Sequence, residues 1–200
     1  MPRDPQELIR FWFGDLSSES LRASHLMAKW FTSSAEFDEE LRSRFGAWLE
    51  DLEEGHLESW LETPRGRQAW VLLTDQVPRN IFRGTPRAFR YDGLSREVAR
   101  SMVRQSWDLE FHPLERVFLY LPFEHSEALE DQNLSVELFE NLAAQAPPAL
   151  TDTLQGALDY AHRHLEPIRK FGRFPHRNEI LGRESTPEEQ AYLASGEGRF

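Results

Sequence analysis

The sequence predicts an all-α protein. Apolar residues recur at steps of three or four along most of the chain, which is the spacing of one buried helix face. No stretch alternates apolar and polar residues over five or more positions, and no Asn-Gly or Asp-Gly pair joins two strand-like runs. We therefore expect a single domain over residues 1–200, a compact array of about seven to nine helices packed as antiparallel pairs.

The first two expected helices are bounded by capping signals. An apolar stripe begins at Leu8, shortly after Pro5. Ser33 and Glu36 have the spacing of a capping box, in which a hydroxyl and a carboxylate cap exposed amides reciprocally. The apolar stripe behind them is expected to end at Gly55, because glycine is the usual residue after a helix.

Proline residues bound the helices that follow. Thr63 is a predicted N-cap before Pro64, and we expect that helix to end before Pro78. The very apolar helix that begins at Pro113 is expected to end before Pro122 for the same reason. The remaining apolar stripes cover residues 94–105, 129–143 and 154–168, and a second capping box at residues 186–189 precedes a short last helix.

The composition excludes several classes of site. The chain of 200 residues has no cysteine, which rules out disulfides, thiolate metal sites and cysteine nucleophiles. The longest apolar run is too short to span a bilayer, and the first residues lack the apolar stretch of a signal peptide. The sequence also lacks a glycine-rich phosphate loop and a nucleophile elbow. We therefore expect a cytoplasmic protein with no membrane partner.

Positive charge is concentrated in two segments of an acidic chain. Lys and Arg number 23 against 34 Asp and Glu, a net charge of −11, which disfavours general nucleic-acid binding. Residues 65–104 nevertheless hold nine arginines against three acids, and residues 162–183 hold six basic residues against two acids. Two alternatives follow: the arginines form an anion site, or they pair with the acidic helices and serve only the fold.

Three short polar segments interrupt the ordinary helical pattern, at residues 75–84, 124–132 and 173–178. We predict that they converge in a pocket for a small anionic molecule, because loops with more charge than a helix connection requires often carry function. Glu124, Glu127 and Asp131 are at helical spacing and are expected to present their carboxylates in one direction. The predicted ligand-binding residues are Asp75, Arg79, Asn80, Arg83, Glu124, Arg173, Arg177 and Asn178.

The same segments contain the candidate catalytic groups. His125 or His176 is the predicted general acid or base, held by the carboxylate of Glu127 or Asp131. A metal site built from these groups and His162 is an alternative. No His-x-x-x-His pair fixes two ligands on one helix face, so we predict no metal, and the sequence identifies no cofactor.

Four stretches resemble the bacterial family called domain of unknown function 924: FWFG (11–14), TPRGRQAWVLLTDQVPRNIFRGTPRAF (63–89), PLERVFLYLPFEHSEALEDQ (113–132) and FGRFPHRNEILGRESTPEE (171–189). The strings DQVPRNIFRG and FGRFPHRN are highly specific to that family. The resemblance implies a compact all-α fold related to tetratricopeptide-like helical arrays, and it implies no activity. One departure is Pro167, which lies where relatives run an unbroken helix.

Two functional hypotheses follow. The first is a helical protein that binds a small anionic ligand in an Arg/His/carboxylate pocket, with the question of enzymatic activity left open. The second is a tetratricopeptide-like scaffold that binds a protein partner, with purely structural polar clusters. A pocket in which the three segments converge favours the first hypothesis, and an open groove with fully paired polar residues favours the second.

Overall fold

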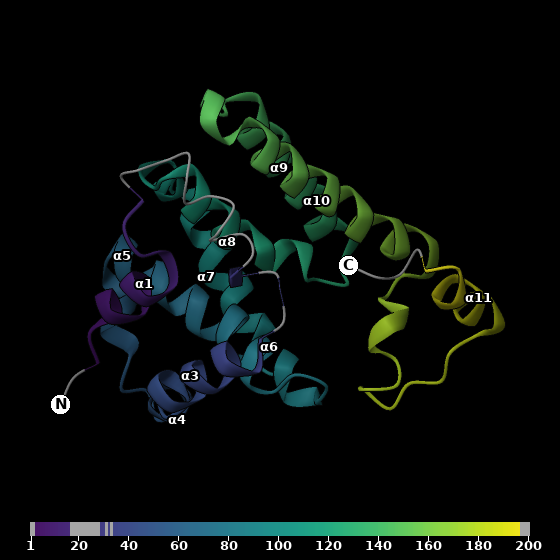
Figure 1. The fold of residues 1–200 in the computed structure, drawn as a ribbon, viewed down its shortest axis with the longest axis horizontal. Helices are drawn as coiled ribbons and strands as arrows, with labels where there is room; N and C mark the ends of the chain where they lie inside the picture. The colour runs from purple at the N-terminus through teal and green to yellow at the C-terminus, as the bar shows by residue number, and fades with distance from the viewer. Residues whose placement is uncertain (1–2, 17–28, 31, 33, 197–200) are drawn as a thin grey trace.

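The computed structural model describes residues 3–16, 29–30, 32 and 34–196. These residues form helices and connecting turns and contain no strand, which confirms the predicted all-α class (Figure 1). No helix among them is long and apolar enough to cross a membrane. The α-helices are α1 (Pro5–Phe13), α3 (Ala35–Phe45), α4 (Trp48–Glu53), α5 (Pro64–Val71), α6 (Val77–Ile81), α7 (Asp92–Arg104), α8 (Pro113–Glu124), α9 (Leu129–Ala144), α10 (Thr151–Phe171) and α11 (Pro187–Ser195).

The predicted caps are confirmed at two helices and shifted at a third. The hydroxyl of Thr63 accepts a hydrogen bond from the backbone N–H of Gly66 at the start of α5. Thr186 and Glu189 form the predicted capping box of α11. At α3 the N-cap is Ser34 instead of Ser33, which lies outside the described residues. The shift follows from the hydrogen bond that the Ser34 hydroxyl accepts from the N–H of Phe37.

Two prolines that were expected to end helices lie inside them. After α5 the chain widens into a π-helical segment, Leu72–Gln76, and the N–H of Val77 bonds to the carbonyl of Leu72. This wider turn places Pro78 at the start of α6, where a missing N–H is tolerated. Pro122 lies in the last turn of α8, where tertiary packing overrides its weak helix propensity, since every residue of α8 from Leu114 to Glu124 is buried.

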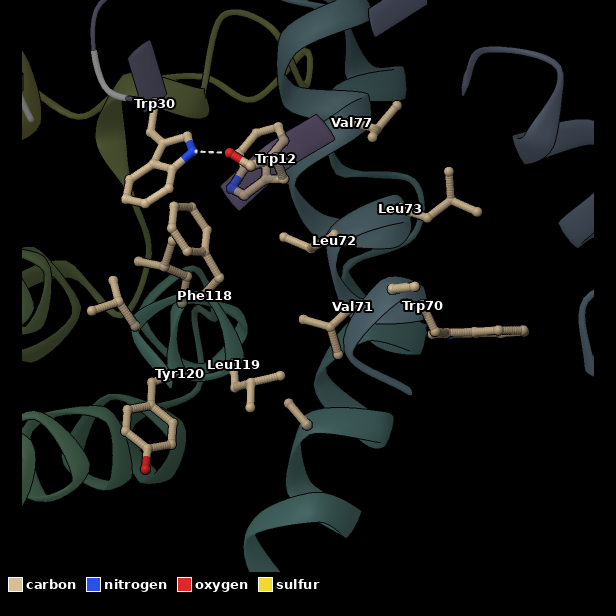
Figure 2. Close-up of a cluster of buried hydrophobic side chains, with 14 of the residues drawn as sticks. Trp12, Trp30, Trp70, Val71, Leu72, Leu73, Val77, Phe118, Leu119 and Tyr120 are labelled. Carbon is tan, nitrogen blue, oxygen red and sulfur yellow. Dashed lines mark hydrogen bonds between the residues drawn. The ribbon is translucent and has the colours of Figure 1, made fainter. Parts of the chain in front are cut away.

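Helix α8 is at the centre of the core. Its Phe118 contacts the ring of Trp30 edge-on, with 4.7 Å between the ring centroids, and also contacts Trp12 and Phe13 from α1. The indole N–H of Trp30 donates to the carbonyl of Trp12 over 3.0 Å (Figure 2). Each such aromatic pair contributes about 0.5–1.5 kcal/mol beyond simple burial. Several residues remote in sequence therefore depend on the position of α8.

Helices α9 and α10 form a pair that lies side by side and packs against α8 (Figure 1). A short 3₁₀ turn, Pro148–Leu150, joins them, so the two helices run antiparallel as predicted. Helix α10 continues through Pro167 to Phe171. Its buried face therefore lies beside the end of α8, where the polar segment that begins at Glu124 enters the protein interior.

Gly66 provides a direct test of the packing between α5 and the preceding 3₁₀ turn, Glu58–Glu62. A Cβ atom at residue 66 would lie 2.1 Å from the carbonyl oxygen of Trp60, which is far inside van der Waals contact. We expect Gly66→Ala to lower the free energy of unfolding by about 2 kcal/mol or more, measured by urea denaturation.

Gly156→Ala is the matched control. Gly156 lies inside α10, and a Cβ there has no atom within 4 Å. The control should therefore stabilise the protein by about 0.5–1 kcal/mol, because alanine is the better helix former. Equal effects of the two substitutions would contradict this account of the close approach.

Candidate functional site

The π-helical segment carries Asp75 into the protein interior. The carboxylate of Asp75 is completely buried, and single π-turns are frequent at functional sites. Its Oδ1 lies 3.1 Å from Nη1 of Arg79, the partner predicted from their spacing of four residues. Burial opposes ionisation of Asp75, but the charge of Arg79 and the bond from His125 outweigh it and lower the pKa to about 2. The group is therefore a buried carboxylate at neutral pH.

Asp75 and His125 form a carboxylate–imidazole pair. His125 directly follows the end of α8, and its Nδ1 lies 2.8 Å from Oδ1 of Asp75. Because an ionised carboxylate can only accept, Nδ1 carries the hydrogen and the lone pair of the neutral ring is on Nε2. Burial and the charge of Arg79 lower the pKa of His125, so the ring is uncharged at neutral pH.

Glu124, the residue before His125, faces a second imidazole. Its Oε1 lies 3.1 Å from Nδ1 of His164 on α10, and that nitrogen is also 2.9 Å from the carbonyl of Tyr160. Burial and the nearby charge of Asp75 raise the pKa of Glu124 to about 8, and burial lowers the pKa of His164 to about 3. Both groups are therefore neutral at pH 7. Oε2 of Glu124 is buried and has no hydrogen-bond partner among the described residues.

Arg177, in the 3₁₀ turn Pro175–Arg177, brings a buried cation to the same place. Its guanidinium lies between two aromatic rings, 4.7 Å from the centroid of Phe89 and 4.3 Å from that of Phe174. Nη1 donates to the carbonyl of His125 over 2.9 Å, whereas Nε has no partner among the described residues. The carboxylate of Asp92 is 3.9 Å away. Burial and the charge of Arg79 lower the pKa of Arg177 to about 10.

The structure thus brings together five of the predicted site residues, and we call them, with His164, the central cluster. The predicted His176 lies beside it, with its ring 5.3 Å from that of Phe174, and burial and the charge of Arg177 lower its pKa to about 4. The members of the central cluster are Asp75, Arg79, Glu124, His125, His164 and Arg177.

The predicted alignment of three carboxylates is wrong. Helix α8 ends at Glu124 and α9 begins only at Leu129, so residues 124–131 do not share one helix face. Glu127 instead forms a bidentate ion pair with Arg183, at 2.7 and 2.9 Å, and accepts the backbone N–H of Phe174. In the described residues, neither oxygen of Glu127 forms a hydrogen bond with a member of the central cluster.

Asp131 also binds partners outside the central cluster. It is buried and binds Arg96 at 3.1 Å, Arg100, and the hydroxyl of Ser126 at 2.7 Å. Its partners come from α7 and from the turn before α9, so it fastens α9 to α7. The predicted role of Asp131 or Glu127 as the group that holds His125 belongs instead to Asp75.

The other predicted ligand-binding residues form ion pairs and hydrogen bonds around the central cluster. Arg173 is bidentate to Glu189, and Asn178 donates to the same carboxylate over 3.2 Å. Asn80 donates to the carbonyl of Gln76. Arg83 is half-exposed and pairs with Asp38 at 3.1 Å. The structure places all four outside the central cluster, as the structural alternative anticipated.

One member of the central cluster, His164, and one neighbour of it, Asp92, were missed from the sequence. His164 lies three residues after Ala161 and four before Ile168, on the buried face of α10, so helical phase was an available signal. Sequence reasoning favoured His162, which is exposed. Asp92 at the start of α7 holds Arg79 in a bidentate pair at 2.8 and 2.9 Å, and no sequence spacing indicated that contact.

One possible metal-ligand group and two surface clefts in the described part of the chain lie away from the central cluster. In the described part of the chain, the group whose ligand atoms lie within 4.8 Å of one another is Asp51, Glu54 and His56, near the surface. The histidines of the predicted alternative do not form such a group. Two surface clefts of about 760 and 510 Å³ are lined by residues around Trp70 and around Phe13. The linings of these two clefts include no member of the central cluster.

The opposite pKa shifts predict a characteristic pH dependence of stability. Unfolding returns His164 and His176 to ordinary values, so below about pH 6.5 they take up protons on unfolding and stability rises with pH. From about pH 6.5 to 8, the folded protein retains the proton of Glu124, which the unfolded chain releases near 4.5. Stability should therefore fall by about 1–2 kcal/mol over that interval.

Urea denaturation at several pH values measures this dependence. Glu124→Gln should remove the decline above pH 6.5, since an amide does not titrate. Glu130→Gln, at an exposed position on α9, should retain it. A decline of equal size in the two variants would contradict the assignment to Glu124.

Comparison with known proteins agrees with the fold. The model of a family described as a bacterial protein of unknown function (DUF924) matches residues 8–197. The chain is similar to the solved structure of a protein of unknown function from Agrobacterium tumefaciens, with 33% identity, a TM-score of 0.79 and coverage of 96% of this chain and 97% of that chain. None of the curated proteins compared with it matches. On the extent of the family match, this chain belongs to the DUF924 family.

Proposed function

We propose that the protein binds a small anionic molecule, with a carboxylate or phosphate group, at Arg177 in the central cluster. The observation that carries the proposal is the incomplete compensation of this buried cation. The side chain of Arg177 is only 8% exposed, yet its nearest carboxylate, on Asp92, is 3.9 Å away. A buried charge without a close partner is unfavourable, and an incoming anion would remove that cost.

The contrast with Arg79 supports this assignment. Arg79 faces two carboxylates, Asp75 at 3.1 Å and Asp92 at 2.8 Å, and its charge is therefore compensated. Asp92 has its short contacts with Arg79, so little of its negative charge serves Arg177. Glu124 adds no negative charge at neutral pH, because its pKa is raised to about 8. An anion that approaches Arg177 thus meets a buried cation whose nearest carboxylate is 3.9 Å away and is already paired with Arg79.

The surrounding ion pairs hold Arg177 in place. Residues 172–186 are an irregular segment, and the carboxylate of Glu127 binds both Arg183 and the N–H of Phe174 within it. The bidentate pair of Arg173 and Glu189 fastens the same segment to α11. Such preorganisation lowers the entropic cost of binding a small ligand. The residues predicted as direct ligands therefore support binding through the position of the segment.

The scaffold hypothesis has one observation in its favour. Arg173 and Arg183 each make bidentate contacts with a carboxylate, so their presence in a loop is explained without a ligand. In that case the polar segments only connect helices, and the partner is a protein that binds an outer helical face. The two hypotheses differ in what inorganic anions do to the protein.

The test is to measure the binding of inorganic phosphate and of acetate by calorimetry and by the shift in melting temperature that each anion causes. We expect at least one of these anions to bind the wild-type protein and to raise its melting temperature. Arg177→Lys should weaken binding by about tenfold or more, because lysine lacks the planar fork that stacks on Phe rings and binds oxyanions bidentately.

Arg83→Lys is the matched control, since Arg83 is half-exposed and pairs with Asp38 at the surface. It should leave anion affinity unchanged. Absence of binding to the wild-type protein, or equal losses in the two variants, would overturn the proposal and favour the scaffold. Comparison of the melting temperatures without anion separates a loss of binding from a loss of fold.

A further inference from the structure

We propose that the central cluster is catalytic, with His125 as the base and Glu124 as the acid in a keto–enol proton transfer on a small anion that contains a carbonyl group. This inference rests on the proposed anion site, because Arg177 would hold the charged end of the substrate. It assigns a reaction and a substrate class to that site. The roles of the two residues depend on which atom of each group carries the proton.

The base is Nε2 of His125. Its Nδ1 lies 2.8 Å from a carboxylate oxygen of the fully buried Asp75, and that carboxylate is also held by Arg79. The hydrogen is therefore on Nδ1 and the lone pair on Nε2. Asp75 is a positioning residue, which fixes the tautomer and the orientation of the ring and stabilises the imidazolium that forms after proton uptake.

The acid is Oε2 of Glu124. Nδ1 of His164 lies 2.9 Å from a backbone carbonyl, which only accepts, so this nitrogen carries a hydrogen. The same N–H faces Oε1 of Glu124 at 3.1 Å, and a second hydrogen on Oε1 would clash with it. The proton of the neutral carboxyl group is therefore on Oε2. That oxygen is buried and has no partner among the described residues, so its hydrogen-bonding capacity is unused within the protein.

The two carboxyl groups have opposite states because their surroundings differ. Asp75 has a guanidinium at 3.1 Å and an imidazole N–H at 2.8 Å, whereas Glu124 has an imidazole at 3.1 Å and no arginine contact in the described chain. The high pKa of Glu124, about 8, agrees with this difference. Two titratable groups whose surroundings shift their pKa values in opposite directions are a typical arrangement for combined acid and base catalysis.

The side chains present favour proton transfer over covalent catalysis. The central cluster consists of arginine, histidine and carboxyl groups, and the chain has no cysteine. No serine, threonine or lysine side chain forms a hydrogen bond with the His125 ring in the described residues, so an activated nucleophile of the usual kind is missing there. One base and one acid are what an enolisation requires.

The proposed step is balanced. Nε2 of His125 removes a proton from the carbon next to the carbonyl, and the electron pair of that C–H bond forms a carbon–carbon double bond. The carbonyl π pair then takes the proton from Oε2 of Glu124, which gives an enol. Return of a proton to carbon reverses the step, so no oxidant, reductant or further reactant is needed. Carbon-bound hydrogen exchanges with solvent as a result.

The experiment measures, by proton NMR, the exchange of carbon-bound hydrogen for deuterium in pyruvate and in dihydroxyacetone phosphate dissolved in D₂O. Each probe has an anionic group and hydrogen on the carbon next to a carbonyl. We expect the wild-type protein to accelerate exchange in at least one probe. Glu124→Gln and His125→Gln should each reduce the exchange rate by about 100-fold or more, since general acid–base groups contribute on this scale.

His162→Gln and Glu130→Gln are the matched controls, because both residues are exposed, His162 on the same helix as His164 and Glu130 just beyond the polar turn that follows Glu124. They should keep the wild-type exchange rate. The Glu124→Gln variant should also retain phosphate affinity, which separates catalysis from binding. Phosphate binding without exchange in either probe would overturn the catalytic inference alone, and failure of phosphate and acetate to bind would overturn the proposed function.

A substrate-free measurement tests the acid directly. Infrared difference spectra between the wild-type protein and Glu124→Gln should contain the carbonyl stretch of a protonated carboxyl group at pH 7, and this band should disappear as the pH rises through about 8. A carboxylate band in its place at pH 7 would show that Glu124 is ionised and would overturn its role as the acid.

Discussion

The burial of the Asp75 carboxylate is the constraint on which the polar interior depends. A charge with no exposure to water is tolerated only when cations and donors surround it, and Asp75 is surrounded by Arg79, His125 and Gln76. Removal of one partner from such a buried set typically costs about 3–5 kcal/mol. The positions of α6 and of the end of α8 are thus tied to one side chain on a π-turn.

The negative charge of Asp75 then determines the state of its neighbours. It raises the pKa of Glu124, which has no arginine of its own, and the same carboxylate fixes the tautomer of His125. Asp75 also shares Arg79 with Asp92, which leaves Arg177 without a close counter-charge. One buried carboxylate therefore accounts for a neutral acid, an oriented imidazole and an incompletely compensated cation, and these three groups carry both proposals.

The ion pairs around the central cluster explain why the charged residues of the polar loops predicted only part of the site. Arg173, Arg183 and Glu127 are as charged as Arg177, yet they pair at the periphery and hold the irregular segment. Sequence alone assigns the same chemistry to all of them. Burial separates the two roles, because the side chain of Arg183 is 25% exposed whereas that of Arg177 is only 8% exposed.

The sequence by itself determined the helical class, most helix starts and the pairing of Asp75 with Arg79, because these depend on local periodicity and on spacing within one turn. Only the tertiary structure decided that His164 and not His162 faces Glu124, that Asp75 and not Asp131 holds His125, and that the helices continue past Pro78 and Pro122. These contacts join residues about 40 to 50 positions apart or depend on packing around α8, so propensity and spacing carry no information about them.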